Sequence, residues 1–421
     1  GAAPGDEARV RIVKDCKRYA FGILDEVLTP SPDRIPVDCA VAGPCGGCSL
    51  RHLDYAAELR AKQENVADVF ARIGGLDVPV LPIVGSPEVN RYRNKVQFPV
   101  GVDKSGKPCI GFYAGRTHRI VPCPDCRLQP GVLNEIGNAL CAFFAEKGIQ
   151  PYSEETGRGL VRHIFLRRGA HSGQIMVCLV CTRAKLPSAE ELCTRLKAQF
   201  AEITTILLNV NAKNTNVILG TETHTLYGQG YIEDTLCGVP VQLGPLSFYQ
   251  VNTLAAEQLY GIAAQYAQLT PDDLLLDLYC GMGTIGLSMA AHCRELIGVE
   301  IVPEAIESAK ANAARMGADV AAKSRFFCAD AGQAATRLAA EGLHPDIVML
   351  DPPRKGCDEA TLSAVVRMSP RRVVYVSCNP ATAARDAAWL EQNGYHAEKV
   401  QPVDLFPRTR HCECVLSLSK V

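Results

Sequence analysis

The sequence predicts an α/β protein in which residues 244–421 form a doubly wound parallel sheet. Three observations predict this fold. First, apolar strand-like runs alternate regularly with helical segments after Leu243. Second, a glycine-rich loop follows the first of these runs, Leu274–Tyr279. Third, two later runs, 347–350 and 373–376, end abruptly in polar turns. We expect a ligand at the carboxyl edge of this sheet, because open α/β sheets bind their ligands there.

Length and composition are those of a globular protein. The 421 residues suffice for two or three domains, and 47% of them are hydrophobic and 21% charged. We find no run of 18 or more apolar residues and no signal peptide, and therefore expect a cytoplasmic protein with no membrane partner. We also expect a monomer. Its nineteen cysteines are then thiols or metal ligands. The net charge of −1 leaves RNA binding to local basic patches.

The chain before residue 244 divides at about residue 36. In residues 1–36, alternating patterns at 8–13 and 19–24 predict two short strands, which are too few to bury a core. Residues 37–243 are predicted to form a central α+β domain, and we expect part of 52–100 to pack on the C-terminal domain. The predicted helices of the central domain cover 53–73 and 188–200, and its strand-like runs include 175–180, 205–210 and 216–219.

Five cysteines of the central domain are candidate metal ligands. Cys39, Cys45 and Cys48 lie within ten residues around a Gly-Gly turn, and Cys123 and Cys126 form a second pair. Two thiolate pairs are typical of a zinc site, whereas Cys39, Cys45, Cys48 and one later cysteine suit an iron–sulfur cluster. Unligated, buried thiols are the third alternative. The residues by themselves leave these alternatives open.

Basic residues gather in two stretches of the central domain. Seven Lys or Arg against one Asp lie between Asn90 and Arg119, interleaved with aromatic residues. Such strands suit RNA, since the cations bind phosphates and the rings stack on bases. A solvated strand face explains the charges equally well. The second stretch contains Arg158, Arg162, Arg167 and Arg168.

The glycine-rich loop has the pattern G-x-G-x-x-G, beginning at Gly281, with Glu300 nineteen residues further on. A nicotinamide-dinucleotide site has this pattern, with glycines for close approach and a carboxylate for ribose hydroxyls. S-adenosylmethionine sites use it too, with a further acid closing the first strand, where Asp277 stands. The motif Asp351-Pro-Pro-Arg favours a methyltransferase, which must hold a planar base beside a methyl sulfonium on a rigid loop.

Cys378 ends the strand-like run 373–376 in a Ser-Cys-Asn-Pro turn. A cysteine at a strand end is usually inert packing. Here it is expected on the same sheet edge as Asp351, with Glu413 at the start of the last strand, and whether Cys378 is a nucleophile depends on which groups reach it. The alternatives Cys280, Cys412 and Cys414 lack the Asn-Pro turn.

These motifs together resemble the RNA uracil-C5 methyltransferases, which make 5-methyluridine. The resemblance runs in order from about Pro4 to the C-terminus. It implies a class I (Rossmann-like) S-adenosylmethionine methyltransferase domain at 244–421. The motifs that carry it are Phe248-Tyr-Gln-Val-Asn252, Asp277-Leu-Tyr-Cys-Gly-Met-Gly283, Asp351-Pro-Pro-Arg354, Ser377-Cys-Asn-Pro380 and His411-Cys-Glu413.

The resemblance also implies site residues. Cys378 is implied as the nucleophile that adds to uracil carbon 6, Glu413 as the base that removes the carbon 5 proton, and Asp351 as the grip on the uracil edge. The implied cofactor contacts are Gln250, Tyr279, Thr284, Glu300, Asp330 and Asp351, of which Thr284 and Asp330 rest only on their position after a strand.

The first three cysteines resemble the branch of this family that carries a [4Fe-4S] cluster and modifies 23S ribosomal RNA. In that branch the fourth ligand lies in a Cys-x-Leu-Gln context, which Cys126-Arg-Leu-Gln129 matches. The resemblance therefore implies the ligands Cys39, Cys45, Cys48 and Cys126 in a central iron–sulfur domain, and 23S ribosomal RNA as substrate, with transfer RNA as the alternative. Residues 1–36 resemble only the second half of the family's TRAM β-barrel.

Two hypotheses from other classes remain. A nicotinamide-dependent oxidoreductase fits the glycine loop and Glu300 but leaves Asp351, Cys378 and Glu413 without a task. A non-catalytic RNA-binding or iron–sulfur scaffold fits the basic stretches and the cysteines, and it would transfer no methyl group to RNA.

Overall fold

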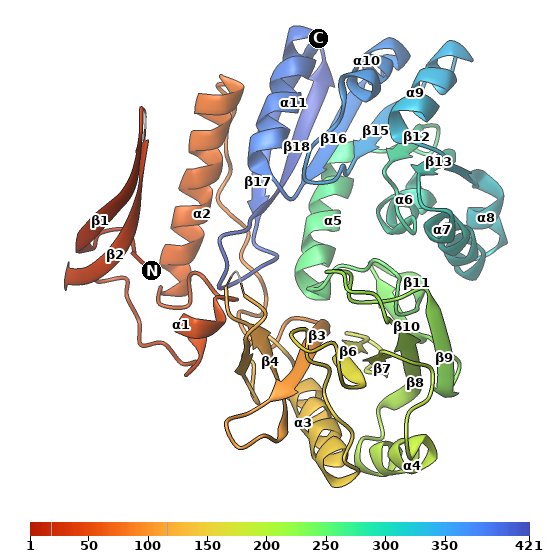
Figure 1. Cartoon of the computed structure of the whole chain (residues 1–421). Coiled ribbons are helices and arrows are strands. Elements are labelled where there is room, and N and C mark those ends of the chain that lie inside the picture. Colours follow the sequence, from red (N-terminus) through yellow and green to blue (C-terminus); the bar gives the residue numbers. More distant parts are fainter. Residues whose placement is uncertain (18, 116) are drawn as a thin grey trace.

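The computed structural model describes residues 1–17, 19–115 and 117–421. Two seven-stranded sheets dominate it, one in the central part of the chain and one in the C-terminal part (Figure 1). Within these ranges no helix is long and apolar enough to cross a lipid bilayer.

The two predicted N-terminal strands are present as an antiparallel hairpin of β1 (Glu7–Cys16) and β2 (Tyr19–Thr29) at the side of the molecule (Figure 1). Several apolar side chains of this hairpin are exposed, including Ile12 at 59% and Tyr19 at 62%. Two strands by themselves have no layer to pack against, so the hairpin contributes no core of its own. Its likeness to part of a TRAM barrel stays a prediction.

The central sheet has the strand order β5-β4-β3-β6-β7-β8-β9, and only β7 and β8 are parallel to each other. Two helices, α3 (Gly131–Glu146) and α4 (Ala189–Gln199), bury apolar side chains against one of its faces. The helix predicted at 188–200 is therefore confirmed. The strands are β3 (Lys95–Val102), β4 (Pro108–Tyr113), β5 (Ile120–Pro122), β6 (Val161–Arg168), β7 (Ile175–Cys181), β8 (Ile203–Val210) and β9 (Glu222–Tyr227).

The strand predicted at 216–219 is wrong. These residues are irregular, and the side-chain amide of Asn211 donates to the carbonyl oxygens of Val217 (2.7 Å) and Ile218 (3.0 Å). A side chain therefore satisfies the carbonyl groups that a neighbouring strand would otherwise bind. The last strand of the sheet begins later, at Glu222.

The C-terminal sheet has the order β14-β13-β12-β15-β16-β18-β17, and its first five strands are parallel. Helices cover both faces, which confirms the predicted doubly wound fold (Figure 1). The strands are β12 (Leu274–Leu278), β13 (Glu295–Glu300), β14 (Ser324–Cys328), β15 (Ile347–Leu350), β16 (Arg372–Ser377), β17 (Tyr395–Val403) and β18 (Glu413–Lys420). The helices are α5 (Thr253–Ala267), α6 (Thr284–Met289), α7 (Pro303–Met316), α8 (Ala318–Lys323), α9 (Ala331–Ala340), α10 (Glu359–Met368) and α11 (Pro380–Gln392).

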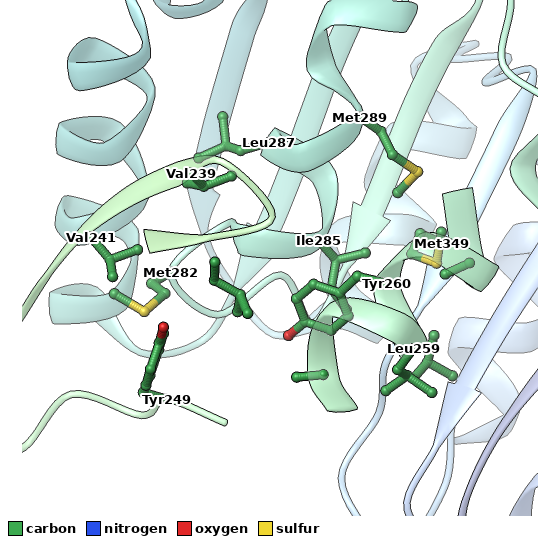
Figure 2. Close-up of a cluster of buried hydrophobic side chains, with 14 of the residues drawn as sticks. Val239, Val241, Tyr249, Leu259, Tyr260, Met282, Ile285, Leu287, Met289 and Met349 are labelled. Atoms are coloured by element: carbon green, nitrogen blue, oxygen red, sulfur yellow. The ribbon is translucent and has the colours of Figure 1, made fainter. Parts of the chain in front are cut away.

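A hairpin of β10 (Ile232–Leu236) and β11 (Val239–Leu243) joins the two halves. Its apolar residues belong to the same buried cluster as α5 and α6. Figure 2 shows Val239 and Val241 beside Leu287 and Met282, the latter from the glycine loop. The core thus holds the glycine loop against the hairpin that follows the central sheet.

Helix α2 (Tyr55–Val69) packs on the C-terminal domain, as expected for part of 52–100. Its Lys62 ammonium contacts the carboxylates of Glu58 (2.7 Å) and Asp404 (2.8 Å), and all three side chains are buried. Glu58 also accepts the backbone N–H of Arg408 at 2.7 Å. These buried charges fix the segment that joins β17 to β18, and with it the start of β18.

Candidate active site

The thiol and the two acids predicted for catalysis meet at the carboxyl edge of the C-terminal sheet. Asp351 follows β15 and Cys378 follows β16. β18 runs antiparallel to β16 with Ser377 opposite Cys414, so Cys378 and Glu413 continue the register side by side. The final antiparallel strand therefore delivers the acid directly to the thiol.

The half-buried thiol of Cys378 lies in an acidic setting. Burial raises its pKa above the usual value, and the charges of Glu413 and Asp351 raise it further. The guanidinium of Arg354 acts in the opposite direction and lowers the pKa of this thiol. Arg354 is thus a cation that favours the thiolate form of Cys378.

The two carboxyl groups are also perturbed. Burial raises the pKa of Asp351 to about 7. Burial raises the pKa of Glu413 to about 8, the charge of Asp351 adds to this, and Arg354 opposes it. Near neutral pH the pair therefore holds protons, and either group can exchange one with a substrate.

Sequence reasoning missed Arg354 as a functional residue. The signal was available, because Arg354 ends the same Asp-Pro-Pro-Arg motif that drew attention to Asp351. The motif shows the loop but does not show that the charge of Arg354 acts on Cys378 and Glu413. That relation comes from the structure.

The glycine loop and β13 form the second half of the site. Glu300 accepts the backbone N–H of Gly281 at 3.1 Å and those of Ile301 and Val302 at 2.8 and 3.0 Å. Tyr279 has a φ of 66°, a left-handed conformation that is costly for a tyrosine and typical of functional loops. These contacts define the shape of the loop around the edge of the sheet.

Three further predicted contacts converge on Tyr260, a buried residue of α5 that no sequence motif marked. Burial raises the pKa of its hydroxyl, the charge of Asp351 raises it further, and the side chains of Thr284 and Gln250 lower it. Asp330 has a structural contact of its own. It caps α9 by accepting the N–H of Gln333 at 3.1 Å, beside the end of β13.

Two arginines of the second basic stretch are internal rather than free for RNA. Arg162 binds the carbonyl oxygens of Asn211 and Lys213, and Arg167, 1% exposed, binds those of Gly244 (2.8 Å) and Ser247 (2.7 Å). They hold loops in place. Of the first stretch, Arg116 lies outside the described residues.

The cysteines predicted as ligands line one cavity of about 280 Å³ in the central domain, together with Cys123. Arg51, 3% exposed, reaches this cavity beside Cys48, and its Nε and one terminal nitrogen have no partner among the described residues. Unsatisfied buried N–H groups beside thiols suit an anionic, thiolate-bound group. The donor set and the room therefore fit a cluster.

A single metal ion fits this cavity less well. In the described ranges, no three His, Cys, Asp or Glu side chains converge as closely as one ion requires. A zinc ion needs four ligands around one centre, whereas a four-iron cluster spreads its four thiolates over separate irons.

Comparison with known proteins identifies relatives over nearly the whole chain. The family described as tRNA (Uracil-5-)-methyltransferase matches residues 54–421. An uncharacterized RNA methyltransferase of Bacillus cereus (strain ATCC 10987) is 42% identical over 419 residues, which cover 99% of this chain and 90% of the relative. Another, from Halalkalibacterium halodurans, is 43% identical over 418 residues, with the same two coverages.

A solved structure has the same overall fold. The tRNA (uracil-54, C5)-methyltransferase of Pyrococcus abyssi, in complex with S-adenosyl-L-homocysteine, superposes with a TM-score of 0.78 at 27% identity. The match covers 99% of this chain and 94% of that chain.

The raised pKa of Glu413 predicts how stability depends on pH. Its carboxyl group binds a proton more tightly in the folded protein (pKa about 8) than when unfolded (about 4.5), so the wild type loses stability as pH rises through this window. The variant Glu413→Gln stays neutral. In thermal unfolding, the melting temperature of the variant minus that of the wild type should be at least about 2 °C larger at pH 9 than at pH 6.

Glu398→Gln is the matched control. Although burial acts against it, hydrogen bonds from Arg372 and Ser417 lower the pKa of Glu398 to about 2, so its melting difference from the wild type should stay constant between pH 6 and pH 9. A pH-independent difference for Glu413→Gln as well would contradict the buried, proton-holding site.

Proposed function

We propose, for a chain that belongs to the tRNA (uracil-5-)-methyltransferase family, that it methylates carbon 5 of a uracil in RNA with Cys378 as nucleophile and Glu413 as base. Its enzyme class is RNA (uracil-5)-methyltransferase. The observation that carries the residue roles is the register that sets Cys378 beside Glu413, with Asp351 and Arg354 around them.

The chemistry requires these groups. Carbon 5 of uracil is a weak nucleophile, so the Cys378 thiolate first adds to carbon 6, and the electron pair of the double bond becomes available at carbon 5 as an enolate. S-adenosylmethionine supplies the electrophilic methyl group. Glu413 then takes the proton from carbon 5, the bond from sulfur to carbon 6 breaks, and the double bond and the thiolate are restored.

The pKa values suit these steps. Arg354 favours the thiolate form of Cys378 before addition. Glu413, with a pKa of about 8, is a stronger base than an ordinary carboxylate once it is ionised. Asp351, with a pKa of about 7, exchanges a proton near neutrality and is proposed to hold the uracil edge.

S-adenosylmethionine is proposed to lie along the glycine loop. Gln250, Tyr279, Thr284, Glu300, Asp330 and Asp351 are its proposed contacts. Support comes from the meeting of Gln250 and Thr284 at Tyr260, and from the Pyrococcus abyssi structure, which contains S-adenosyl-L-homocysteine. Asp330 has the least support, since its side chain serves as a helix cap.

The RNA substrate is proposed to be 23S ribosomal RNA. The resemblance of the thiols to the cluster-carrying branch supports it, and the Pyrococcus abyssi transfer-RNA enzyme supports the alternative, transfer RNA. Cys39, Cys45, Cys48 and Cys126 are the proposed ligands of a [4Fe-4S] cluster. We further propose a monomer that acts in the cytoplasm; the location is in keeping with nineteen cysteines of which none forms a disulfide.

Methyl transfer tests the function. With methyl-labelled S-adenosylmethionine and unmodified ribosomal or transfer RNA, we expect 5-methyluridine in the ribosomal RNA. Cys378→Ala should reduce turnover at least about 10³-fold and still bind the cofactor, because only the nucleophile is lost. Glu413→Gln should leave a protein–RNA adduct on gels. The exposed Cys328→Ala is the control and should behave as wild type. Normal turnover by Cys378→Ala would contradict the role of Cys378 as nucleophile.

The cluster has its own test. Protein purified without oxygen should be brown and contain about four irons and four acid-labile sulfides per chain. Cys45→Ala should lose them, whereas Cys141→Ala, a buried thiol of α3 outside the cavity, should keep them. One zinc per chain with no sulfide would overturn the cluster.

A further inference from the structure

The loop that carries Arg354 is held by the helix that follows the nucleophile. This loop, Asp351–Cys357, has no regular structure of its own. Asn379, the residue after Cys378, donates its side-chain N–H to the carbonyl oxygen of Arg354 at 3.0 Å. Arg385 of α11 donates to the carbonyl oxygens of Lys355 and Cys357, both at 3.1 Å. The nucleophile and Arg354 are therefore both anchored to one helix.

At the centre of this contact lies Asp386 of α11, a carboxylate that the proposed chemistry does not use. Its side chain is 1% exposed. One oxygen accepts the backbone N–H of Cys357 (2.8 Å) and the hydroxyl of Tyr375 (2.6 Å), and the other accepts Nε of Arg385 (2.7 Å). Tyr375 belongs to β16, the strand that ends at Cys378. Asp386 thus connects the strand of the nucleophile with the loop of Arg354.

The loop approaches this carboxylate closely. Gly356 has a φ of 78°, and a Cβ placed there would lie 2.6 Å from Oδ2 of Asp386 and 2.5 Å from a guanidinium nitrogen of Arg385. The N–H of Gly356 also donates to the carbonyl oxygen of Pro353 at 2.8 Å, which closes a tight turn with Arg354 inside it. Only glycine lets the backbone at residue 356 come this close to the Asp386 carboxylate. The close contact fixes the position of the turn relative to Asp386.

We propose that Asp386 is a positioning residue for the reaction: it fixes the turn Pro353–Gly356 so that the Arg354 guanidinium reaches the sulfur of Cys378. The inference rests on the proposed function, because it gives Arg354 the task of favouring the Cys378 thiolate. A buried carboxylate is costly unless its oxygens accept hydrogen bonds. The three hydrogen bonds that Asp386 accepts come from the loop of Arg354, from β16 and from α11, and these elements set the separation between Arg354 and Cys378.

The test measures the reactivity of Cys378 in the intact protein without substrate. Iodoacetamide alkylation is followed between pH 6.5 and pH 10 by peptide mass spectrometry, with Cys328 in the same sample as internal control. In Asp386→Asn the midpoint for Cys378 should rise by about one pH unit. Its rate at pH 8 should then fall about tenfold, since the thiolate fraction falls tenfold per unit below the pKa. Cys328 should not change.

Turnover separates positioning from general stability. Asp386→Asn should lower kcat about tenfold and leave KM for S-adenosylmethionine unchanged. Arg354→Ala should raise the Cys378 midpoint similarly, and the double variant should shift it no further, because both changes remove one interaction. Asp319→Asn, on the first turn of α8, should match wild type. Additive shifts, or a wild-type midpoint in Asp386→Asn, overturn the inference.

The test still applies if Asp386→Asn fails to fold or if the proposed function fails. If Asp386→Asn does not fold, Arg385→Gln replaces it, since that side chain is half exposed and also grips the loop. A shift in the same direction then supports the inference and no shift overturns it. Failure of the proposed function looks different, because Cys378→Ala would then retain methyl transfer whatever Asp386→Asn does.

Discussion

The candidate site is governed by the burial of three acidic groups that are crowded at one edge of the sheet. Burial raises the pKa values of Cys378, Asp351 and Glu413; the charge of Asp351 raises those of Cys378 and Glu413 further, and the charge of Glu413 raises that of Cys378. Arg354 is the cation that opposes this for both Cys378 and Glu413. The burial that hinders the thiolate form of Cys378 also makes the ionised carboxylate of Glu413 more basic, so one constraint acts on both groups.

The fold provides this crowding by topology. Parallel strands bring the ends of β15 and β16 to one edge, and the antiparallel β18 starts where β16 stops. Lys62 fixes the segment before β18 through Asp404, and Asn94 of the central domain donates to the carbonyl oxygen of Gln250 at 2.7 Å. Elements far apart in sequence therefore converge on the candidate site, and the central domain contacts the segment that carries Gln250.

Residues at strand ends could be predicted from the sequence, because an apolar run that stops in a polar turn marks the edge of a parallel sheet. Cys378, Asp351 and Glu300 were found in this way, and the sheet itself followed from the alternation of strands and helices. The prediction of a strand at 216–219 was wrong because the apolar pattern does not reveal that the Asn211 side chain donates hydrogen bonds to carbonyl oxygens of this segment. Arg162 and Arg167 counted as candidate RNA contacts, since charge in a sequence does not tell burial from exposure. Arg354, Tyr260 and Asp386 depend on packing between distant segments, which no local pattern records.

Mapping of a trapped adduct tests the central claim most directly. RNA that carries 5-fluorouridine cannot release fluorine from carbon 5 as a cation, so the adduct cannot be resolved after methyl transfer. Protease digestion and mass spectrometry should then place the RNA on the peptide that contains Cys378, and only when S-adenosylmethionine is present. A cofactor-dependent link to Cys280, Cys412 or Cys414 instead, or no covalent link at all, would contradict the account.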